Sequence, residues 1–322
     1  MSDLSRNAFK VQNILLSYGF YILLVLFIIF FSIVSESFLT ASNWTQISIV
    51  ACFLLTASAG LTTVIITGNI DLSLGSVAYV AAAMVYVTSG YPPAISILVG
   101  IAAGIAAGLI NGVLVSHLRM NSLLTTLGIL IAYRGISLVI TGGTVRPVSE
   151  GLRFLGGIKF FDFIPLVFLI GFVVMITLQI VLSKTKFGAY CYAIGNSEQA
   201  ADRIGIPVKM VKTVVFVISG TCGAISGILL PMYLGEVTTF TGRGMEFEAV
   251  AAVVIGGTSL FGGRGNILPG TFAGALLLII INNGLGTIGV SPYSYPFVAG
   301  VVIFLAIYLD SLKKLRRSSR FD

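Results

Sequence analysis

The sequence predicts an all-α, polytopic membrane protein with about ten transmembrane helices. The chain has 322 residues, of which 57% are hydrophobic and 10% are charged. Soluble domains carry roughly 25% charged residues, so this composition is typical of a chain that lies mostly in lipid. A membrane-spanning helix needs about 20 apolar residues, and apolar runs near that length recur along the whole sequence.

Ten such runs are separated by short polar or glycine-containing segments. They cover residues 18–34, 46–67, 72–90, 94–115, 122–141, 164–182, 213–233, 246–262, 267–286 and 293–309. The eighth run is short, and the second and third are barely separated. We expect residues 1–322 to form a single transmembrane domain.

The positions of lysine and arginine predict the orientation, because cytoplasmic loops are enriched in these residues. With the N-terminus in the cytoplasm, the inside receives Arg6, Lys10, Arg119, Lys184, Lys186, Arg203, Lys209, Lys212, Arg264, Lys313, Lys314, Arg316, Arg317 and Arg320. The outside receives Arg146, Arg153, Lys159 and Arg243. We therefore expect both termini in the cytoplasm, with residues 313–322 as a basic tail.

The net charge of +7 indicates a membrane partner rather than a nucleic acid, because the charges lie between apolar runs. Cys52, Cys191 and Cys222 have no metal-binding spacing, and His117 is the single histidine. We expect no metal site, and we interpret the cysteines as small buried apolar groups.

Glycines mark two places where backbones approach closely. Residues 246–270 hold an apolar run, a glycine-rich segment (256–265) and a new apolar run, which predicts a short span, a tight turn and the next span. An ordinary helix contact without a transport role is the alternative. In the fourth run, Gly100, Gly104, Gly108 and Gly112 lie on one helix face and predict close packing against another helix.

The longest predicted cytoplasmic loop, 183–212, contains the signals of a short, bounded helix. Asn196 or Ser197 can cap its start, Glu198 suits its first turn, and Gly205 followed by Pro207 can end it. We interpret it as a docking element rather than a solvated loop.

Asp71 lies where the second and third runs meet, next to Asn69 and Ser73. A carboxylate in lipid is costly unless neighbouring groups satisfy it. It can cap the third span, and the same segment can form a discontinuous helix at a translocation pathway. The two interpretations are compatible.

Other polar groups in or beside the spans allow both structural and pathway roles. Arg134 can reach the outer interface or point into a cavity, and Glu246 and Glu248 complement the dipole at the start of the eighth span. Glu246 and Glu248 can also contact a hydroxylated solute at the outer mouth of the glycine-rich hairpin. Asparagines in a bundle bond between helices or bind solute, and the candidates are Asn121, Asn282 and Asn283.

Two enzyme classes are disfavoured. Gly257–Gly262 has the glycine spacing of a phosphate-binding loop, but Gly263 and Arg264 occupy the positions of its lysine and hydroxyl residue. An intramembrane aspartyl protease needs a second carboxylate to pair with Asp71. The sequence therefore predicts no enzyme and no cofactor bound by this chain.

Three blocks resemble the permease subunits of ATP-binding-cassette importers for ribose, arabinose, xylose and galactosides. They are residues 68–76 (GNIDLSLGS), 193–206 (AIGNSEQAADRIGI) and 253–265 (VVIGGTSLFGGRG) continuing to 282–285 (NNGL). Residues 121–127 and Arg134–Gly135 also fit. The resemblance covers most of residues 45–310.

The resemblance implies a type II importer permease with the fold of the vitamin B12 importer class, in a bacterial inner membrane. It implies alternating access driven by ATP on separate ATPase subunits, a second permease subunit and an extracytoplasmic sugar-binding protein. The coupling contacts would come from Asn196, Ser197, Glu198, Ala200, Ala201, Asp202, Arg203 and Gly205. An ion-coupled secondary transporter of a small polar solute, with Asp71 titrated, stays the alternative.

Overall fold

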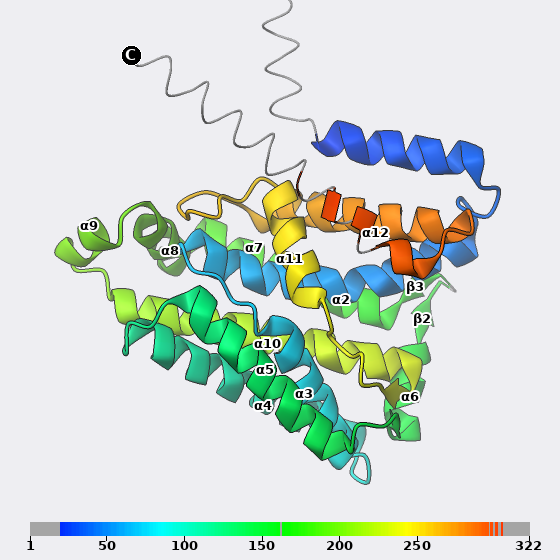
Figure 1. Ribbon diagram of the computed structural model, residues 1–322, viewed down its shortest axis with the longest axis horizontal. Helices are drawn as coiled ribbons and strands as arrows, with labels where there is room; N and C mark the ends of the chain where they lie inside the picture. The colour runs from blue at the N-terminus through cyan, green and yellow to red at the C-terminus, as the bar shows by residue number, and fades with distance from the viewer. Residues whose placement is uncertain (1–19, 162, 296, 299, 302–303, 305–322) are drawn as a thin grey trace, which may run out of the picture.

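The computed structural model describes residues 20–161, 163–295, 297–298, 300–301 and 304 (Figure 1). Most of the tenth predicted span lies outside the described residues, and so do the basic tail 313–322 and the predicted cytoplasmic residues Arg6 and Lys10. The described chain is mostly helical, as the composition predicted.

The longer helices are α2 (Ala41–Ile66), α4 (Pro93–Ser116), α5 (Ser122–Thr141), α7 (Leu166–Lys184), α10 (Val208–Leu234) and α12 (Phe272–Thr287). The shorter ones are Phe20–Val34, α3 (Leu74–Val87), α6 (Glu150–Gly157), α8 (Lys186–Asn196), α9 (Glu198–Arg203) and α11 (Met245–Ile255). A π-helical turn, η1 (Ile267–Thr271), leads into α12, and a 3-10 turn, η2 (Pro292–Ser294), follows it. Two antiparallel pairs, β1 (Arg146–Pro147) with β4 (Glu236–Val237) and β2 (Lys159–Phe160) with β3 (Ile164–Pro165), complete the list.

The prediction of about ten spans is not confirmed. Within the described residues, six helical stretches are long and apolar enough to cross a membrane: α2, α4, α5, α7, α10 and Ile267–Thr287. The first, third and eighth predicted spans correspond to shorter helices, namely Phe20–Val34, α3 and α11. The helix α11 stops at Ile255, seven residues before the predicted end, because the backbone turns at Gly257 with φ of 89°.

Local chemistry determines several helix ends. The Thr40 side chain accepts a hydrogen bond from the Asn43 amide at the start of α2, and Asn121 accepts one from Leu124 at the start of α5. Both are N-caps that satisfy amides without a partner in the helix. The helices α5 and α10 end where Gly142 and Gly235 adopt left-handed backbone, with φ of 65° and 80°.

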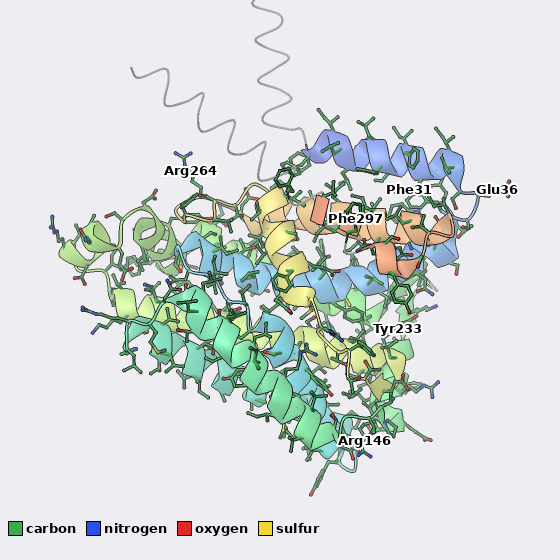
Figure 2. The ribbon with its side chains drawn as sticks, in the orientation of Figure 1. Phe31, Glu36, Arg146, Tyr233, Arg264 and Phe297 are labelled. Carbon is green, nitrogen blue, oxygen red and sulfur yellow. The ribbon has the colours of Figure 1, made fainter. Side chains whose placement is uncertain are left out.

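The helix α2 runs through the middle of the bundle, with α12 on one side and α3 and α10 on the other (Figure 1). It contributes much of the core, including the fully buried Leu55, Leu61 and Ile65. On the α12 side, the ring of Phe31 lies so close to Gly284 that a Cβ there would overlap it (Figure 2).

The glycine ridge of α4 packs against α10, as predicted. A Cβ at Gly104 would meet Ala224 and the carbonyl of Gly220, and one at Gly108 would meet the carbonyl of Phe216. Similarly, Gly220 on α10 lies against the carbonyl of Gly104. The glycines at this contact have no side chains, so the two backbones can touch. Close backbone contact increases van der Waals attraction between helices in lipid, where the hydrophobic effect does not drive them together.

The loops predicted for opposite membrane faces lie at opposite ends of the bundle. One end holds α8 and α9, and the other holds α6 and the short strands (Figure 1). Arg264 and Arg146, predicted inside and outside, likewise lie far apart, at the upper left and the lower right of the view (Figure 2). The segment that carries the predicted outer residues Arg146, Arg153 and Lys159 includes the short helix α6, whose start Ser149 caps.

All three cysteines are free and buried, as predicted. Cys191 lies in α8, outside the long helices, and burial raises the pKa of its thiol to about 12. Thiolate is the reactive form, so we expect negligible labelling of Cys191 by N-ethylmaleimide at pH 7.5 in a Cys52→Ser, Cys222→Ser chain. Mass spectrometry of native membranes checks this, with Gln199→Cys, at an exposed α9 position, as the labelled control. Rapid modification of Cys191 would contradict its placement.

Candidate functional site

The segment between α2 and α3 is irregular backbone held inside the protein. Gly68 turns the chain with φ of 75°. The Ile70 amide then donates to Ser122 Oγ at 3.2 Å, and the Leu72 amide donates to Thr126 Oγ1 at 3.0 Å. The first turns of α5 thus replace the hydrogen bonds that a continuous helix would supply, which is the condition for non-helical backbone at membrane depth.

Asp71 is the centre of a buried polar network. Its Oδ1 accepts from the Ser73 amide at 3.0 Å and from Ser73 Oγ at 2.6 Å, and its Oδ2 accepts from Ser219 Oγ at 2.8 Å. Asn111 Nδ2 in turn donates to Ser73 Oγ at 2.6 Å. The four side chains are 0% exposed and join α3, α4, α10 and the 68–73 segment.

The network corrects one prediction. Ser73, and not Asp71, is the residue that immediately precedes α3, and its side chain bonds to Asp71 instead of capping the helix. Asp71 and Ser73 are buried, hold helices together in this arrangement and line neither cavity described below, and their pathway role stays a prediction. Sequence reasoning missed Asn111 and Ser219. The signal for Asn111 was an amide embedded in the glycine ridge.

The half-buried Arg134 binds a turn of the backbone. Its Nη1 donates to the Thr239 carbonyl at 3.4 Å and its Nη2 to the Thr241 carbonyl at 3.3 Å. The guanidinium also lies over the Tyr79 ring, 5.5 Å from the centroid. Arg134 therefore joins α5 and α3 to the turn that precedes α11.

The two glutamates of α11 have different environments, although both lie in its first turn as predicted. Glu246 is 5% exposed, and its carboxylate packs so tightly on α3 that a Cβ at Gly75 would overlap it. Glu246 Oε2 has no hydrogen-bond partner among the described residues. Glu248, by contrast, is exposed and faces a cavity.

This cavity, of about 670 Å³, lies between α2, α11 and α12, and we call it the outer cavity because it lies toward the side that the sequence predicts to be extracytoplasmic. Its polar lining comes from Asn43, Gln46, Arg243, Glu248, Asn282, Asn283 and Thr287, and its aromatic lining from Phe53, Phe240 and Tyr295. Asn43 and Asn283 exchange amide hydrogen bonds of 3.0 and 2.8 Å across α2 and α12. A concave apolar site with a few amides and a carboxylate suits a small hydroxylated solute.

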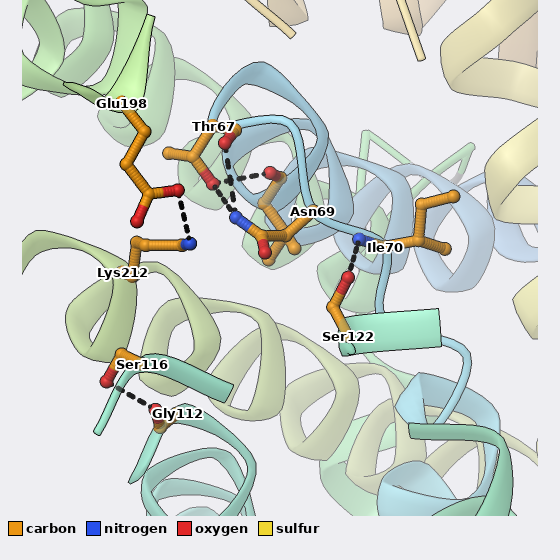
Figure 3. Close-up of polar contacts among 9 residues, drawn as sticks. Thr67, Asn69, Ile70, Gly112, Ser116, Ser122, Glu198 and Lys212 are labelled. Atoms are coloured by element: carbon orange, nitrogen blue, oxygen red, sulfur yellow. Dashed lines mark hydrogen bonds and ion pairs between the residues drawn. The ribbon is translucent and has the colours of Figure 1, made fainter. Parts of the chain in front are cut away.

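A second cavity, of about 610 Å³, lies at the other end of α2, toward the predicted cytoplasmic side, and we call it the inner cavity. Figure 3 shows some of its lining residues, among them Asn69, Glu198 and Lys212. Polar or charged residues from six segments line it: Asn69, Ser116, Arg119, Asn121, Ser122, Glu198, Gln199, Asp202, Lys209 and Lys212. Asn69 Nδ2 donates to the carbonyl and the Oγ1 of Thr67, both at 3.1 Å. The structure thus brings two predicted pathway residues, Asn69 and Asn121, together with two predicted coupling residues.

The predicted helix in the cytoplasmic loop is present as α9. Ser197 caps it by accepting from the Ala200 amide at 3.2 Å, whereas Asn196 is the last residue of α8. An ion pair of 2.9 Å between Glu198 and Lys212 fixes α9 to α10 (Figure 3). After α9, Gly205 turns the backbone with φ of 81°.

The coupling candidates divide into an exposed and a buried set. The exposed ones are Asn196, Ser197, Glu198, Ala200, Asp202, Arg203 and Gly205. Ala201 is 2% exposed, so it packs α9 onto the bundle and is not available to a partner. Ile204, which the sequence-based candidates did not include, is 75% exposed at the end of α9.

The glycine-rich turn contacts both α2 and α8. The Gly263 amide donates to the Ile66 carbonyl at 2.9 Å, at the last residue of α2. Tyr192 of α8 donates its hydroxyl to the Gly265 carbonyl at 2.8 Å. Gly195 lies between them, because a Cβ there would overlap the Ile66 carbonyl and the Gly263 amide. The end of α2, the glycine-rich turn and the end of α8 therefore form one close contact, which we call the three-segment junction.

The family described as branched-chain amino acid transport system, permease component, matches residues 43–307. The chain belongs to this permease family. Family membership and the long apolar helices together make the chain a multi-pass membrane permease. Its relatives are transport proteins rather than enzymes.

Three relatives illustrate the similarity. The ribose import permease protein of Bacillus subtilis is 38% identical over 295 residues, which cover 90% of this permease and 91% of the relative. The ribose import permease protein of Escherichia coli strain K12 is 34% identical over 304 residues, covering 91% and 93%. The autoinducer 2 import system permease protein of Photorhabdus laumondii is 30% identical over 282 residues, covering 87% and 84%. No solved structure matches this permease.

Proposed function

We propose that the chain is the permease subunit of an ATP-binding-cassette importer for a monosaccharide or a related small polyol. The names of the ribose import permeases support the transport class and the solute class. The outer cavity, with its amides, Glu248 and aromatic rings, has the chemistry for such a solute. The solute moves by alternating access, driven by ATP on a separate subunit.

The observation that carries this proposal is the attachment of α9. It is a capped helix with an exposed polar face, fixed to α10 by the Glu198–Lys212 pair. It follows α8, whose end forms the three-segment junction with α2 and the glycine-rich turn. A partner that moves α9 would therefore move α2, whose other end lines the outer cavity, and this is how we propose that an ATPase drives the permease.

The remaining partners follow from the family resemblance. A second permease subunit completes the pathway, and an extracytoplasmic sugar-binding protein delivers the solute. The permease lies in the bacterial inner membrane with both termini on the cytoplasmic side, as the uneven distribution of lysine and arginine indicates.

Uptake by reconstituted vesicles tests the proposal. We expect proteoliposomes with the permease, its ATPase and the binding protein to accumulate radiolabelled ribose only with ATP, and to continue when ionophores collapse ion gradients. Accumulation that needs a proton or sodium gradient and no ATPase would favour a secondary transporter.

A matched pair of variants localises the ATPase contact. Ile204→Asp should reduce co-purification of the ATPase with the permease, and Phe154→Asp, at an exposed position of α6 at the other end of the bundle, should not. Equal co-purification would contradict the role of α9.

A further inference from the structure

The inner cavity contains further charges beyond the Glu198–Lys212 pair that the proposed coupling role uses. Three cations line it, Arg119, Lys209 and Lys212, against two carboxylates, Glu198 and Asp202. The Glu198–Lys212 pair is the one ion pair found among the described residues. Arg119, Lys209 and Asp202 are left without an ion-pair partner in that part of the chain, and the lining has one net positive charge.

The backbone of Arg119 is held in an unusual conformation. Its φ is 55°, in the left-handed region that non-glycine residues rarely adopt. The surrounding turn imposes it, because Leu118 N and Met120 N donate back to the carbonyls of Val113 and Leu114, both at 3.2 Å. The turn thus places a cation at the cavity wall, between α4 and α5, at a position where glycine or asparagine would fit more easily.

We propose that the inner cavity binds a hydroxylated phosphate ester. The phosphate lies between Arg119, Lys209 and Lys212, since guanidinium and ammonium groups are the usual phosphate ligands. The hydroxyl groups bond to Asp202 and to the amides of Asn69 and Asn121 on the same wall. A volume of about 610 Å³ is within the range of small-molecule sites.

Binding has a mechanical consequence because the wall is made of separate elements. The ligand contacts α9, the start of α10 and the α4–α5 turn at once. It therefore stabilises the arrangement of α9 seen here relative to any arrangement in which α9 has moved. A soluble sugar phosphate and the headgroup of phosphatidylglycerol share this chemistry, and the cavity lies at the end of the bundle where both are accessible.

Thermal unfolding of the full chain in nanodiscs tests the proposal and distinguishes the two sources. In phosphatidylcholine discs, we expect ribose 5-phosphate at saturating concentration to raise the unfolding midpoint by about 3 °C, and ribose at the same concentration to leave it unchanged. In a second arm without added ligand, discs with phosphatidylglycerol replace those of phosphatidylcholine alone. A rise in the first arm identifies a soluble ester, and a rise in the second alone identifies the lipid.

Two double variants make the test specific. Arg119→Asn with Lys209→Gln removes the two unpaired cations, and asparagine tolerates left-handed backbone, so the turn should survive. This variant should lose the rise. Lys184→Gln with Lys186→Gln removes two exposed charges from the same end of the bundle but outside the cavity, and should keep it. No rise in either arm, or a rise that persists in the Arg119/Lys209 variant, overturns the proposal.

Discussion

Replacing Gly195 with alanine is expected to reduce ATP-driven uptake about tenfold or more while leaving the permease inserted in the membrane. The new Cβ would overlap the Ile66 carbonyl and the Gly263 amide, so the three-segment junction must open. Forcing one extra carbon into a closely packed contact costs roughly 1–3 kcal/mol, and about 1.4 kcal/mol corresponds to a factor of ten. Initial rates of uptake in proteoliposomes with the ATPase measure the effect.

A matched control separates loss of coupling from general disturbance. Gly128 lies in a long helix, and an added Cβ there meets nothing within 4 Å, so Gly128→Ala should transport normally. The ATPase should still co-purify with the Gly195→Ala permease, because the exposed face of α9 is unchanged. Normal uptake by Gly195→Ala would show that the junction does not transmit the movement of α9.

Sequence reasoning succeeded where the structural signal is local. The fifth predicted span, 122–141, coincides with α5 because Asn121 caps its start and Gly142 ends it. The short helix α9 was found in the same way, from Ser197 and Gly205. Caps act within three or four residues of the chain, so no knowledge of the fold is needed to recognise them.

Sequence reasoning failed where the outcome depends on tertiary contacts. The eighth apolar run continues beyond Ile255, and only the turn at Gly257 shows that α11 is short. The helices α2 and α5 are both apolar enough to span, yet α2 is mostly buried within the protein and α5 mostly exposed on its surface. Apolar composition does not distinguish a protein neighbour from a lipid neighbour.

The candidate site shows the same division. The sequence indicated which polar groups matter near the spans, but not their partners. The partners of Asp71 include Ser219, 148 residues away, and Arg134 bonds to two backbone carbonyls, which have no sequence signature at all. Eight of the nine predicted pathway residues therefore divide into the Asp71 network, the Arg134 contact with the turn before α11, and two cavities at opposite ends of α2, and Glu246 packs against α3 instead.

Replacing Asp71 with alanine is expected to lower the stability of the permease by about 3 kcal/mol or more. The change removes the acceptor of three hydrogen bonds and leaves the Ser73 amide and hydroxyl and the Ser219 hydroxyl buried with fewer partners. Each unsatisfied buried group costs roughly 1–3 kcal/mol. The unfolding midpoint in detergent should fall well below that of the unmodified chain.

The variants around Asp71 decide whether its role is structural or a step in ion coupling. Asp71→Asn keeps an acceptor oxygen, so it should lose less stability than alanine, and Glu36→Ala, at an exposed carboxylate in a loop, should lose none (Figure 2). Ser219→Ala in the Asp71→Ala background should cause little further loss of stability, because Asp71 and Ser219 share one hydrogen bond.

If the Asp71 network only holds α3, α4 and α10 together, the Asp71→Asn permease should still take up sugar with ATP in the presence of ionophores. Full stability combined with lost uptake in Asp71→Asn would instead place this carboxylate in the translocation step, and the secondary-transport alternative would then be favoured.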